Sequence, residues 1–439
     1  MYDIIYIGGG LNYAGAVIAS REGKKVALFE KDLNQLGGVC LHKGCIPSKM
    51  FLHYSNIIRQ SKSDILNGAL TIDMQKLIAQ KEELLNNATT AIKKQCANID
   101  LIEAKAEIIA PNKVKANGKI YEAKYIIIGT GSSPFIPNGI DYNKNDIITS
   151  DEVLMLQDLP KEIAIYGAGA IALEMATFFA NVGVEVTIIN RSNKWLKRAN
   201  EFISTQIKKE LQKLDITLLE EHQIKSAKST KKGVHIIFEN GESIYKPMLL
   251  VATGRVANID AIKTDLIKIK NSAILTDEYF ETTLKNHYAI GDCNGKVQLA
   301  HAARAEVLNV TNRILNKKPK VLNLNNVVKF INTLPMSYAT VGLNAYMLEK
   351  NNIPYTQSIV TLNRFTYSYY NDAIDGVMIS YIDKDGFILG AEILSPHAQE
   401  LIATIAMSLA GEMDKNQAKE TIFAHPTFSE ALERTFFKL

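Results

Sequence analysis

Two cysteines, Cys40 and Cys45, lie five positions apart in the segment Gly-Gly-Val-Cys-Leu-His-Lys-Gly-Cys-Ile-Pro-Ser-Lys, residues 37–49. A regular helix would separate their Cα atoms by roughly 8–9 Å, whereas a disulfide spans at most about 7 Å. A bridge between them therefore requires a distorted helix, and the strain would raise its reduction potential, as suits a catalytic disulfide. Taken alone, the pair is equally consistent with two inert core thiols.

The composition indicates a globular protein with several domains. The chain has 439 residues, of which 47% are apolar and 22% charged, and this length predicts about three domains. Only four cysteines occur, too few for a secreted disulfide framework of this size. In a reducing compartment a cysteine pair is more often catalytic than structural.

Charge and hydropathy exclude two classes of partner. The 50 basic residues are interleaved with 46 acidic ones, for a net charge of +4, so nucleic-acid binding is not supported. No segment approaches about 18 uncharged apolar residues, and the N-terminus lacks a signal-like apolar core. We therefore expect a cytoplasmic protein that is not bound to a membrane.

Two segments predict the same strand–turn–helix–strand unit. Near the N-terminus, apolar runs at 3–7 and 25–29 enclose glycines and a helical pattern; runs at 162–166 and 185–189 do the same. Such units bind dinucleotides. After Asp292 the pattern changes to alternating strands and an apolar helix, which predicts an α+β domain with an antiparallel sheet. The expected strands and helix are 327–331, 357–362, 376–382, 387–393 and 398–410.

In the first unit, Gly8 and Gly10 occupy the first two positions of a dinucleotide-binding glycine motif. The third position is Tyr13, which weakens the motif. Glu30, at the end of the second strand, lies where an acidic side chain would accept hydrogen bonds from an adenosine ribose. Alternatively, Glu30 is a surface residue that ends the strand.

In the second unit the three positions are filled by Gly167, Gly169 and Ala172. Where a module for NAD would carry Asp or Glu after its second strand, this chain has Asn190 followed by Arg191.

Arg191 and nearby Lys197 could pair with a 2′-phosphate, which favours NADPH. The alternative is a solvated basic turn beside an NAD site in which Asn190 still bonds the ribose.

Together these segments resemble the pyridine nucleotide-disulfide oxidoreductases, flavoproteins that include dihydrolipoamide dehydrogenase, glutathione reductase and mercuric reductase. The resemblance covers nearly the whole chain. It also rests on Ala289-Ile-Gly-Asp-Cys293, Leu299-Ala-His301 and His425-Pro-Thr-Phe-Ser-Glu430. It implies an α/β fold with two Rossmann-like domains, for FAD and for NAD or NADP, plus a C-terminal α+β dimerisation domain. The expected boundaries are 1–148 with 272–322 for FAD, 149–271 for NAD(P) and 323–439 for dimerisation.

The resemblance also implies roles for individual residues. Cys45 would lie nearer the flavin, and Cys40 would exchange with a dithiol substrate. His425, oriented by Glu430, would be the base that ionises the substrate thiol, acting on the disulfide of the other subunit of a homodimer.

Further residues are assigned to the cofactors by the same resemblance. Lys49 would lie near the flavin, paired with Glu174, and Asp292 would hold the ribityl chain. The remaining expected cofactor contacts are Gly8, Gly10, Glu30, Gly38, Thr130, Gly131, Gly291, Leu299, Ala300, His301, Gly167, Gly169, Ala172, Asn190, Arg191, Lys197, Gly254 and Arg255. For His301 the alternative is that it caps a helix.

Within the family, Ile46-Pro-Ser-Lys49 and the alanine before His425 most resemble dihydrolipoamide dehydrogenases. The implied substrate is a dihydrolipoyl group, and a lipoyl-bearing multienzyme complex is a partner that the resemblance allows. An NADPH-dependent reductase of glutathione or another small disulfide is the alternative, and a non-catalytic flavoprotein subunit is a third. His42-Lys43 and Leu334–Gly342 depart from the family pattern, so a non-standard disulfide partner stays open.

The other cysteines and histidines predict no further site. Cys96 and Cys293 are expected to be core thiols. No metal site is expected, because metal-ligand spacing is absent among His53, His222, His235, His287 and His397.

Overall fold

The computed structural model describes residues 1–333 and 335–439, so Leu334 of the stretch 334–342 lies outside the described residues. The chain divides into two compact units. Unit 1 contains Met1–Met50, Met74–Phe135 and Gly254–Leu324; unit 2 contains Phe51–Asp73, Ile136–Thr253 and Asn325–Leu439. Residues 254–271 belong to unit 1 because Ala261 and Ile267 pack in the same core as Ile5 and Ile128. The expected three-domain division stays a prediction.

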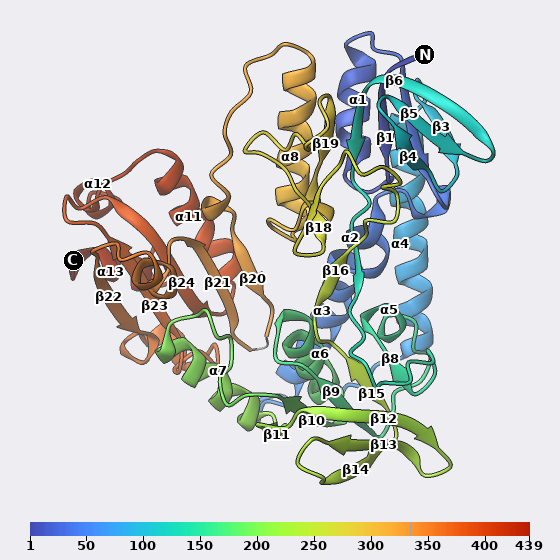
Figure 1. Ribbon diagram of the computed structural model, residues 1–439. Helices are drawn as coiled ribbons and strands as arrows, with labels where there is room; N and C mark the ends of the chain where they lie inside the picture. The colour runs from blue at the N-terminus through green and yellow to red at the C-terminus, as the bar shows by residue number, and fades with distance from the viewer. Residues whose placement is uncertain (334) are drawn as a thin grey trace. The chain divides into compact units, whose positions relative to one another are not determined.

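A seven-stranded sheet organises unit 1 (Figure 1), in the order β3-β2-β1-β6-β5-β4 with β19 beside β6. Strands β3, β2, β1, β6 and β19 are parallel, whereas β5 and β4 continue the sheet antiparallel from the first half of β6. The bounds are β1 (Tyr2–Ile7), β2 (Val26–Glu30), β3 (Asp100–Glu103), β4 (Glu107–Ala110), β5 (Lys113–Ala116), β6 (Lys119–Ile128) and β19 (His287–Ala289).

Helices flank this sheet because its parallel strands need crossover connections. Helix α1 packs against α8, where a Cβ at Gly15 would lie 2.6 Å from Thr311 Oγ1. The bounds are α1 (Asn12–Arg21), α2 (Gly38–Lys43), α3 (Cys45–Ser61), α4 (Met74–Gln95) and α8 (Ala300–Ile314), with short helices η1 (Leu33–Gln35) and η2 (Gly291–Asn294). Two small ribbons complete unit 1: β7 (Ser132–Pro134) with β16 (Arg255–Ala257), and β17 (Ile269–Lys270) with β18 (Ala273–Ile274).

Unit 2 contains a parallel sheet in the order β11-β10-β9-β15-β8. A three-stranded antiparallel sheet, β12-β13-β14, is inserted in the chain between β11 and β15 of the parallel sheet and was not expected from the sequence. The bounds are β8 (Ile147–Ile148), α5 (Ser150–Val153), β9 (Glu162–Tyr166), α6 (Ala170–Asn181), β10 (Glu185–Asn190), α7 (Glu201–Lys213), β11 (Thr217–Glu220), β12 (Ile224–Thr230), β13 (Gly233–Phe238), β14 (Ser243–Lys246) and β15 (Leu249–Val251).

The C-terminal part of unit 2 is an antiparallel sheet in the order β20-β21-β24-β23-β22. Four of its strands and helix α11 match the expectation; β21 was not predicted. The bounds are η3 (Leu324–Asn326), β20 (Lys329–Ile331), β21 (Ser337–Gly342), α9 (Ala345–Lys350), β22 (Thr356–Thr361), η4 (Leu362–Arg364), α10 (Thr366–Tyr369), β23 (Val377–Ile382), β24 (Ile388–Ser395), α11 (Ala398–Ala410), α12 (Lys415–Lys419) and α13 (Ser429–Phe437).

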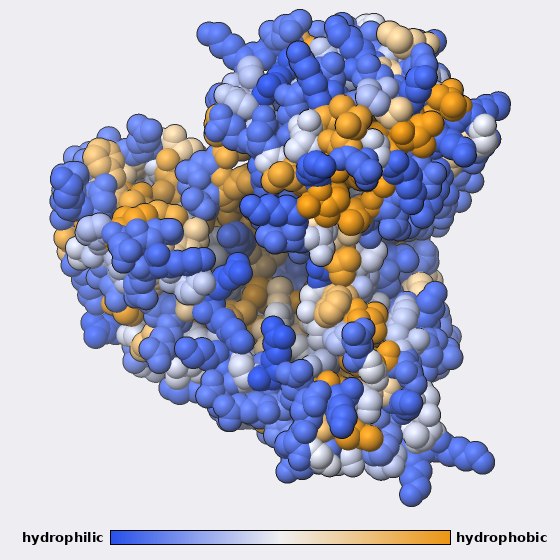
Figure 2. Space-filling view, in the orientation of Figure 1, coloured by the Kyte–Doolittle hydropathy of each residue, from blue (hydrophilic) through white to orange (hydrophobic). Residues whose placement is uncertain are grey.

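The hydropathy of the surface and of the helices is relevant to whether the chain could enter a membrane. Hydrophilic residues cover most of the face seen in Figure 2, with apolar residues in separate patches. Among the described residues, no helix is both long enough and apolar enough to cross a membrane.

Candidate active site

The turn after β1 forms an open cradle of backbone. Gly8 has φ 96°, and a Cβ there would lie 2.3 Å from the carbonyl oxygen of Gly129, so only glycine lets β1 and β6 end side by side. A Cβ at Gly10 would meet only the Cα of Gly38, at 3.9 Å. The backbone at Gly10 is therefore accessible to a close-fitting ligand. Helix α1 packs closely at Gly15, two residues after Tyr13, where a Cβ would lie 2.7 Å from Val307 Cγ2.

Acidic side chains lie at two edges of this cradle. Glu30 ends β2 and its Oε2 accepts a hydrogen bond from Gly9 N at 2.6 Å. Asp292, on the turn η2, accepts from Ser132 Oγ at 2.5 Å. Arg255 donates from Nε to the same Ser132 Oγ at 2.7 Å. The structure thus joins two predicted residues, Asp292 and Arg255, through a serine that the sequence did not indicate.

Glu306, on α8, is a buried carboxyl group that the sequence analysis missed. It has 0% exposure, and its Oε2 accepts from Gly291 N at 2.7 Å and from Asn294 Nδ2 at 2.8 Å. Its buried Oε1 has no hydrogen-bond partner among the described residues. Burial raises the pKa of Glu306 to about 7, against smaller opposing effects of the two hydrogen bonds and Lys296. This carboxyl group supports the turn that carries Asp292.

Glu306→Gln is expected to gain stability relative to the parent as pH rises. The folded pKa of Glu306, about 7, lies above the ordinary value of 4.5. The folded parent therefore holds an extra proton between these values, and its stability falls as pH rises through that window. Glutamine cannot ionise, so the two proteins should diverge by at most about 3 kcal/mol between pH 5 and 8. Unfolding midpoints measured across that range test this; parallel curves would contradict it.

The two cysteines lie at a break between helices. Helix α2 ends at Lys43, Gly44 interrupts it, and α3 begins at Cys45. A Cβ at Gly44 would lie 2.9 Å from Val39 O, so glycine permits the tight connection. The expected distortion of the helix is present at this glycine.

The break brings the two thiols into contact. A hydrogen bond with Cys45, followed by burial, raises the pKa of the Cys40 thiol far above its usual range, while the charge of Lys49 acts to lower it. Cys45 is exposed and Cys40 is half-buried. The pair is therefore a dithiol placed to form a disulfide, not two separate core thiols. Cys96 and Cys293, by contrast, are buried at 1% and 0% exposure.

Unit 2 repeats the glycine turn of unit 1. Gly167 has φ 131°, and a Cβ there would lie 2.3 Å from the carbonyl oxygen of Ala252. Gly169 precedes α6 and has open space around it, while Ala172 is fully buried. The same physical requirement, two strand ends in close approach, explains both turns.

The basic loop after β10 is shaped by its own residues. Asn190 is 4% exposed; its Oδ1 accepts from Ser192 N at 3.2 Å and its Nδ2 donates to Lys194 O at 3.1 Å. The buried Trp195 donates from Nε1 to Glu220 at 2.6 Å. Asn190 therefore holds the loop together through its amide, while Arg191 and Lys197 are exposed.

A histidine and a carboxylate form an exposed pair near the C-terminus. His425 Nδ1 lies 2.8 Å from Glu430 Oε2, and Thr427 N donates to Glu430 Oε1 at 2.8 Å. Burial acts to raise the pKa of Glu430, but the hydrogen bonds from His425 and Thr427 lower it overall. A carboxylate facing Nδ1 holds the hydrogen there and leaves Nε2 as the proton acceptor. The side chain of His425 is 81% exposed.

Comparison with known proteins identifies the family. Residues 2–306 match the family model described as pyridine nucleotide-disulphide oxidoreductase, and residues 330–436 match the dimerisation domain of the same family. The chain belongs to this family. The predicted fold class and the prediction of a flavoprotein disulfide oxidoreductase are thereby confirmed.

Relatives extend over nearly the whole chain. A dihydrolipoyl dehydrogenase of Mycoplasma genitalium is 30% identical, covering 98% of this chain and 96% of the relative. A mercuric reductase of Lysinibacillus sphaericus is 28% identical, covering 98% and 81%. The HOCl-induced flavoprotein disulfide reductase RclA of Escherichia coli has the same fold, with a TM-score of 0.89, 23% identity and 99% coverage of both chains.

The predicted residues of this oxidoreductase fall into two groups. Unit 1 contains the glycine cradle, Glu30, Asp292 and the cysteine pair; Thr130, Gly131, Gly254, Leu299, Ala300 and His301 also belong to it. Unit 2 contains the second glycine turn, the basic loop, Glu174 and the His425–Glu430 pair. The expected pairing of Lys49 with Glu174 joins residues of different units and stays a prediction.

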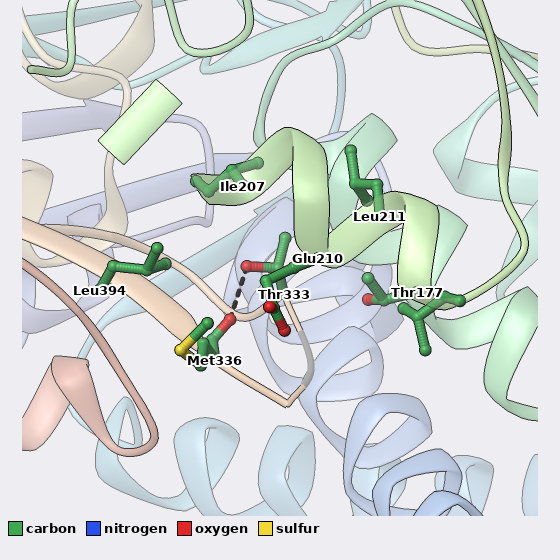
Figure 3. A pocket seen from close by; sticks show the side chains of 8 residues that line it. Thr177, Ile207, Glu210, Leu211, Thr333, Met336 and Leu394 are labelled. Atoms are coloured by element: carbon green, nitrogen blue, oxygen red, sulfur yellow. Dashed lines mark hydrogen bonds between the residues drawn. The ribbon is translucent and has the colours of Figure 1, made fainter. Parts of the chain in front are cut away.

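A small pocket of unit 2 involves the stretch that departs from the family pattern. Figure 3 shows Met336 beside Thr333, whose Oγ1 donates to Met336 O at 2.7 Å. Burial raises the pKa of Glu210, which faces this pocket and accepts from Lys213. None of the predicted site residues belongs to the described residues that line it: Thr177, Ile207, Glu210, Leu211, Leu214, Thr333, Met336 and Leu394.

Proposed function

We propose that this chain is a dihydrolipoamide dehydrogenase-like enzyme that oxidises dihydrolipoyl dithiols with NAD(P)+. The observation that carries the proposal is the contact of Cys40 with Cys45 at the helix break. Relatives of this length named dihydrolipoyl dehydrogenase support the choice of a dithiol substrate. A lipoyl-bearing multienzyme complex is the partner that such a substrate implies.

The residues of unit 1 fit FAD. Gly8 and Gly10 leave the backbone open to a pyrophosphate, and Glu30 lies beside the same turn, next to Gly9. Asp292 and Ser132 offer a carboxylate and a hydroxyl at the second edge of the cradle. Bound FAD would supply the two-electron transfer between the nicotinamide and the cysteine pair.

Thiol–disulfide exchange accounts for the substrate half of the reaction. One substrate thiolate attacks Sγ of Cys40, the bond to Cys45 breaks, and Cys45 leaves as a thiolate. The second substrate thiolate then attacks the sulfur bound to Cys40, closing the substrate disulfide and releasing the Cys40 thiolate. The substrate loses two electrons and two protons, and the cysteine pair gains the electrons.

His425 would take the first of these protons. Only the thiolate attacks, and a free thiol has a pKa of about 8.5. The orientation of the ring by Glu430 leaves Nε2 for that proton. In a homodimer, which the dimerisation domain at 330–436 supports, this histidine would serve the partner subunit's cysteine pair.

An NADPH-dependent reductase of glutathione or another small disulfide is the second candidate. It is favoured by the exposed Arg191 and Lys197 and by the absence of a carboxylate at Asn190. The same thiol–disulfide exchange would run in reverse, with the reduced cysteine pair giving two electrons to the substrate disulfide.

Arg191→Ala is expected to lower kcat/KM for the phosphorylated dinucleotide roughly tenfold to a hundredfold, because it removes a charge-assisted hydrogen bond to the 2′-phosphate. The value for the unphosphorylated dinucleotide should change little. Lys209→Ala, which removes an exposed lysine from α7, is the matched control. Equal effects on both dinucleotides would refute a role of Arg191 in selecting the 2′-phosphate.

The function is tested by oxidation of dihydrolipoamide with NAD+ and NADP+ measured side by side on the flavin-loaded protein. Turnover with either nucleotide supports the proposal and shows which one is used. Absence of turnover with both, together with NADPH-dependent reduction of a small disulfide, would favour the second candidate.

A further inference from the structure

His42 lies between the two cysteines in the chain, and its ring is anchored on one side. Nε2 is 2.9 Å from the carbonyl oxygen of Leu36 and 3.3 Å from Thr89 Oγ1 on α4. The histidine thus connects the last turn of α2 to the turn before it and to the long helix α4. All of these residues belong to unit 1.

The hydrogen-bond partners determine which ring nitrogen carries the hydrogen. A carbonyl oxygen only accepts, and the hydroxyl of Thr89 already donates to Leu85 O at 2.9 Å. Both neighbours of Nε2 are therefore acceptors. Nε2 carries a hydrogen shared between them, in the neutral ring and in the imidazolium alike.

We propose that His42 is a positioning residue of the redox disulfide, which holds the end of α2 so that Cys40 stays in contact with Cys45. This inference rests on the proposed disulfide chemistry. It assigns a role to part of the His42-Lys43 departure from the family pattern.

The need for an anchor follows from the local structure. Helix α2 has six residues, too few to be stable alone, and at its far end Gly44 breaks the chain direction. Its beginning is held by the hydrogen bond of Gly37 N to Gly9 O at 2.9 Å. His42 provides a corresponding attachment at its end, one residue before Lys43 and two before the break.

Loss of the anchor should weaken the disulfide relative to the dithiol. Disulfide closure depends on how often the two sulfurs face each other, so a looser α2 lowers their effective concentration. One hydrogen bond usually makes a modest net contribution to stability, so its loss should shift the dithiol–disulfide equilibrium roughly three- to tenfold towards the dithiol. A tenfold shift corresponds to about 30 mV for this two-electron couple.

The test equilibrates the flavin-loaded protein with mixtures of reduced and oxidised dithiothreitol. The reagent's dithiol gives two electrons and two protons to the bridge and becomes its own cyclic disulfide. Alkylation followed by mass spectrometry of the Cys40–Cys45 peptide then measures the thiol fraction without reliance on activity. A parent with no bridge at any ratio would overturn the proposed function together with this inference.

Three variants separate anchoring from other effects. His42→Leu should show the full shift, and His42→Gln, whose amide can reach the same acceptors, should stay within about twofold of the parent. Thr89→Val, which is distant from the cysteines in the chain and conserves the shape of the side chain, should shift the equilibrium in the same direction by less. The double variant His42→Leu with Thr89→Val should show the same shift as His42→Leu alone, because Thr89 acts on the cysteine pair through its contact with His42.

Two outcomes would overturn the inference while leaving the proposed function intact. One is that His42→Leu and Thr89→Val both keep the dithiol–disulfide equilibrium of the parent protein. The other is that His42→Leu and His42→Gln both shift the equilibrium towards the disulfide. Such a result would mean that His42 acts through the charge of its ring on a thiolate and not as an anchor. If His42→Leu does not fold, a Thr89→Val protein at the parental equilibrium is sufficient to refute it.

Discussion

Serine in place of Cys45 is expected to abolish dihydrolipoamide oxidation and the long-wavelength absorbance that a thiolate gives beside a flavin. Cys45 is the contact partner of Cys40, and a hydroxyl group cannot close a disulfide or leave as a stable anion in exchange. Anaerobic titration with two electrons per flavin, followed by absorbance spectroscopy, measures the band, and a steady-state assay measures the loss of turnover.

The control for this variant is Cys96→Ala. Cys96 is 1% exposed and burial raises the pKa of its thiol, so it should be inert and its loss should leave both signals. A Cys45→Ser protein that still oxidises the dithiol at the parental rate would refute the exchange chemistry.

Glutamine in place of His425 is expected to lower dithiol oxidation by about 10²- to 10⁴-fold near pH 7, the usual contribution of a general base. Glutamine fills similar space but takes no proton. The deficit should shrink as pH approaches the thiol's own pKa of about 8.5, because solvent then ionises the substrate. The measurement is kcat/KM for dihydrolipoamide between pH 6 and 9.

A second histidine–carboxylate pair offers a matched control. His222 Nε2 lies 3.2 Å from Glu242 Oε2, so His222→Gln removes another histidine–carboxylate pair from a different part of unit 2. Parental activity is expected there. A constant deficit of His425→Gln across the whole pH range would mean that the histidine does not act as the base.

Much of the nucleotide-binding architecture was predictable from short segments. Gly8 and Gly167 were assigned to tight turns from their spacing alone, and in both turns a Cβ would meet a carbonyl oxygen at 2.3 Å. The strand 162–166 and the helix 398–410 have the predicted bounds. These features depend on local backbone geometry and on apolar periodicity, which the sequence displays directly.

Other parts of the site depended on which residues meet in space. The role of Asn190 as a ribose ligand stays a prediction, and only the structure showed that its amide also bonds Ser192 and Lys194 of its own loop. The stretch that includes β21 was noted as a departure from the family pattern, although in the sheet it lies between β20 and β24. Its pairing partner β24 is about fifty residues further along the chain, and nothing local specifies such a partner.

The sequence by itself determined the family, the two glycine turns and the presence of a cysteine pair next to a helix start. Only the tertiary structure decided how that pair is held: by Gly44 at the break and by His42 against Thr89, 47 positions away. It alone showed Glu306 buried beneath the turn of Asp292. Turn glycines act through their own φ angles, whereas burial and hydrogen-bond partners exist only once distant segments have packed together.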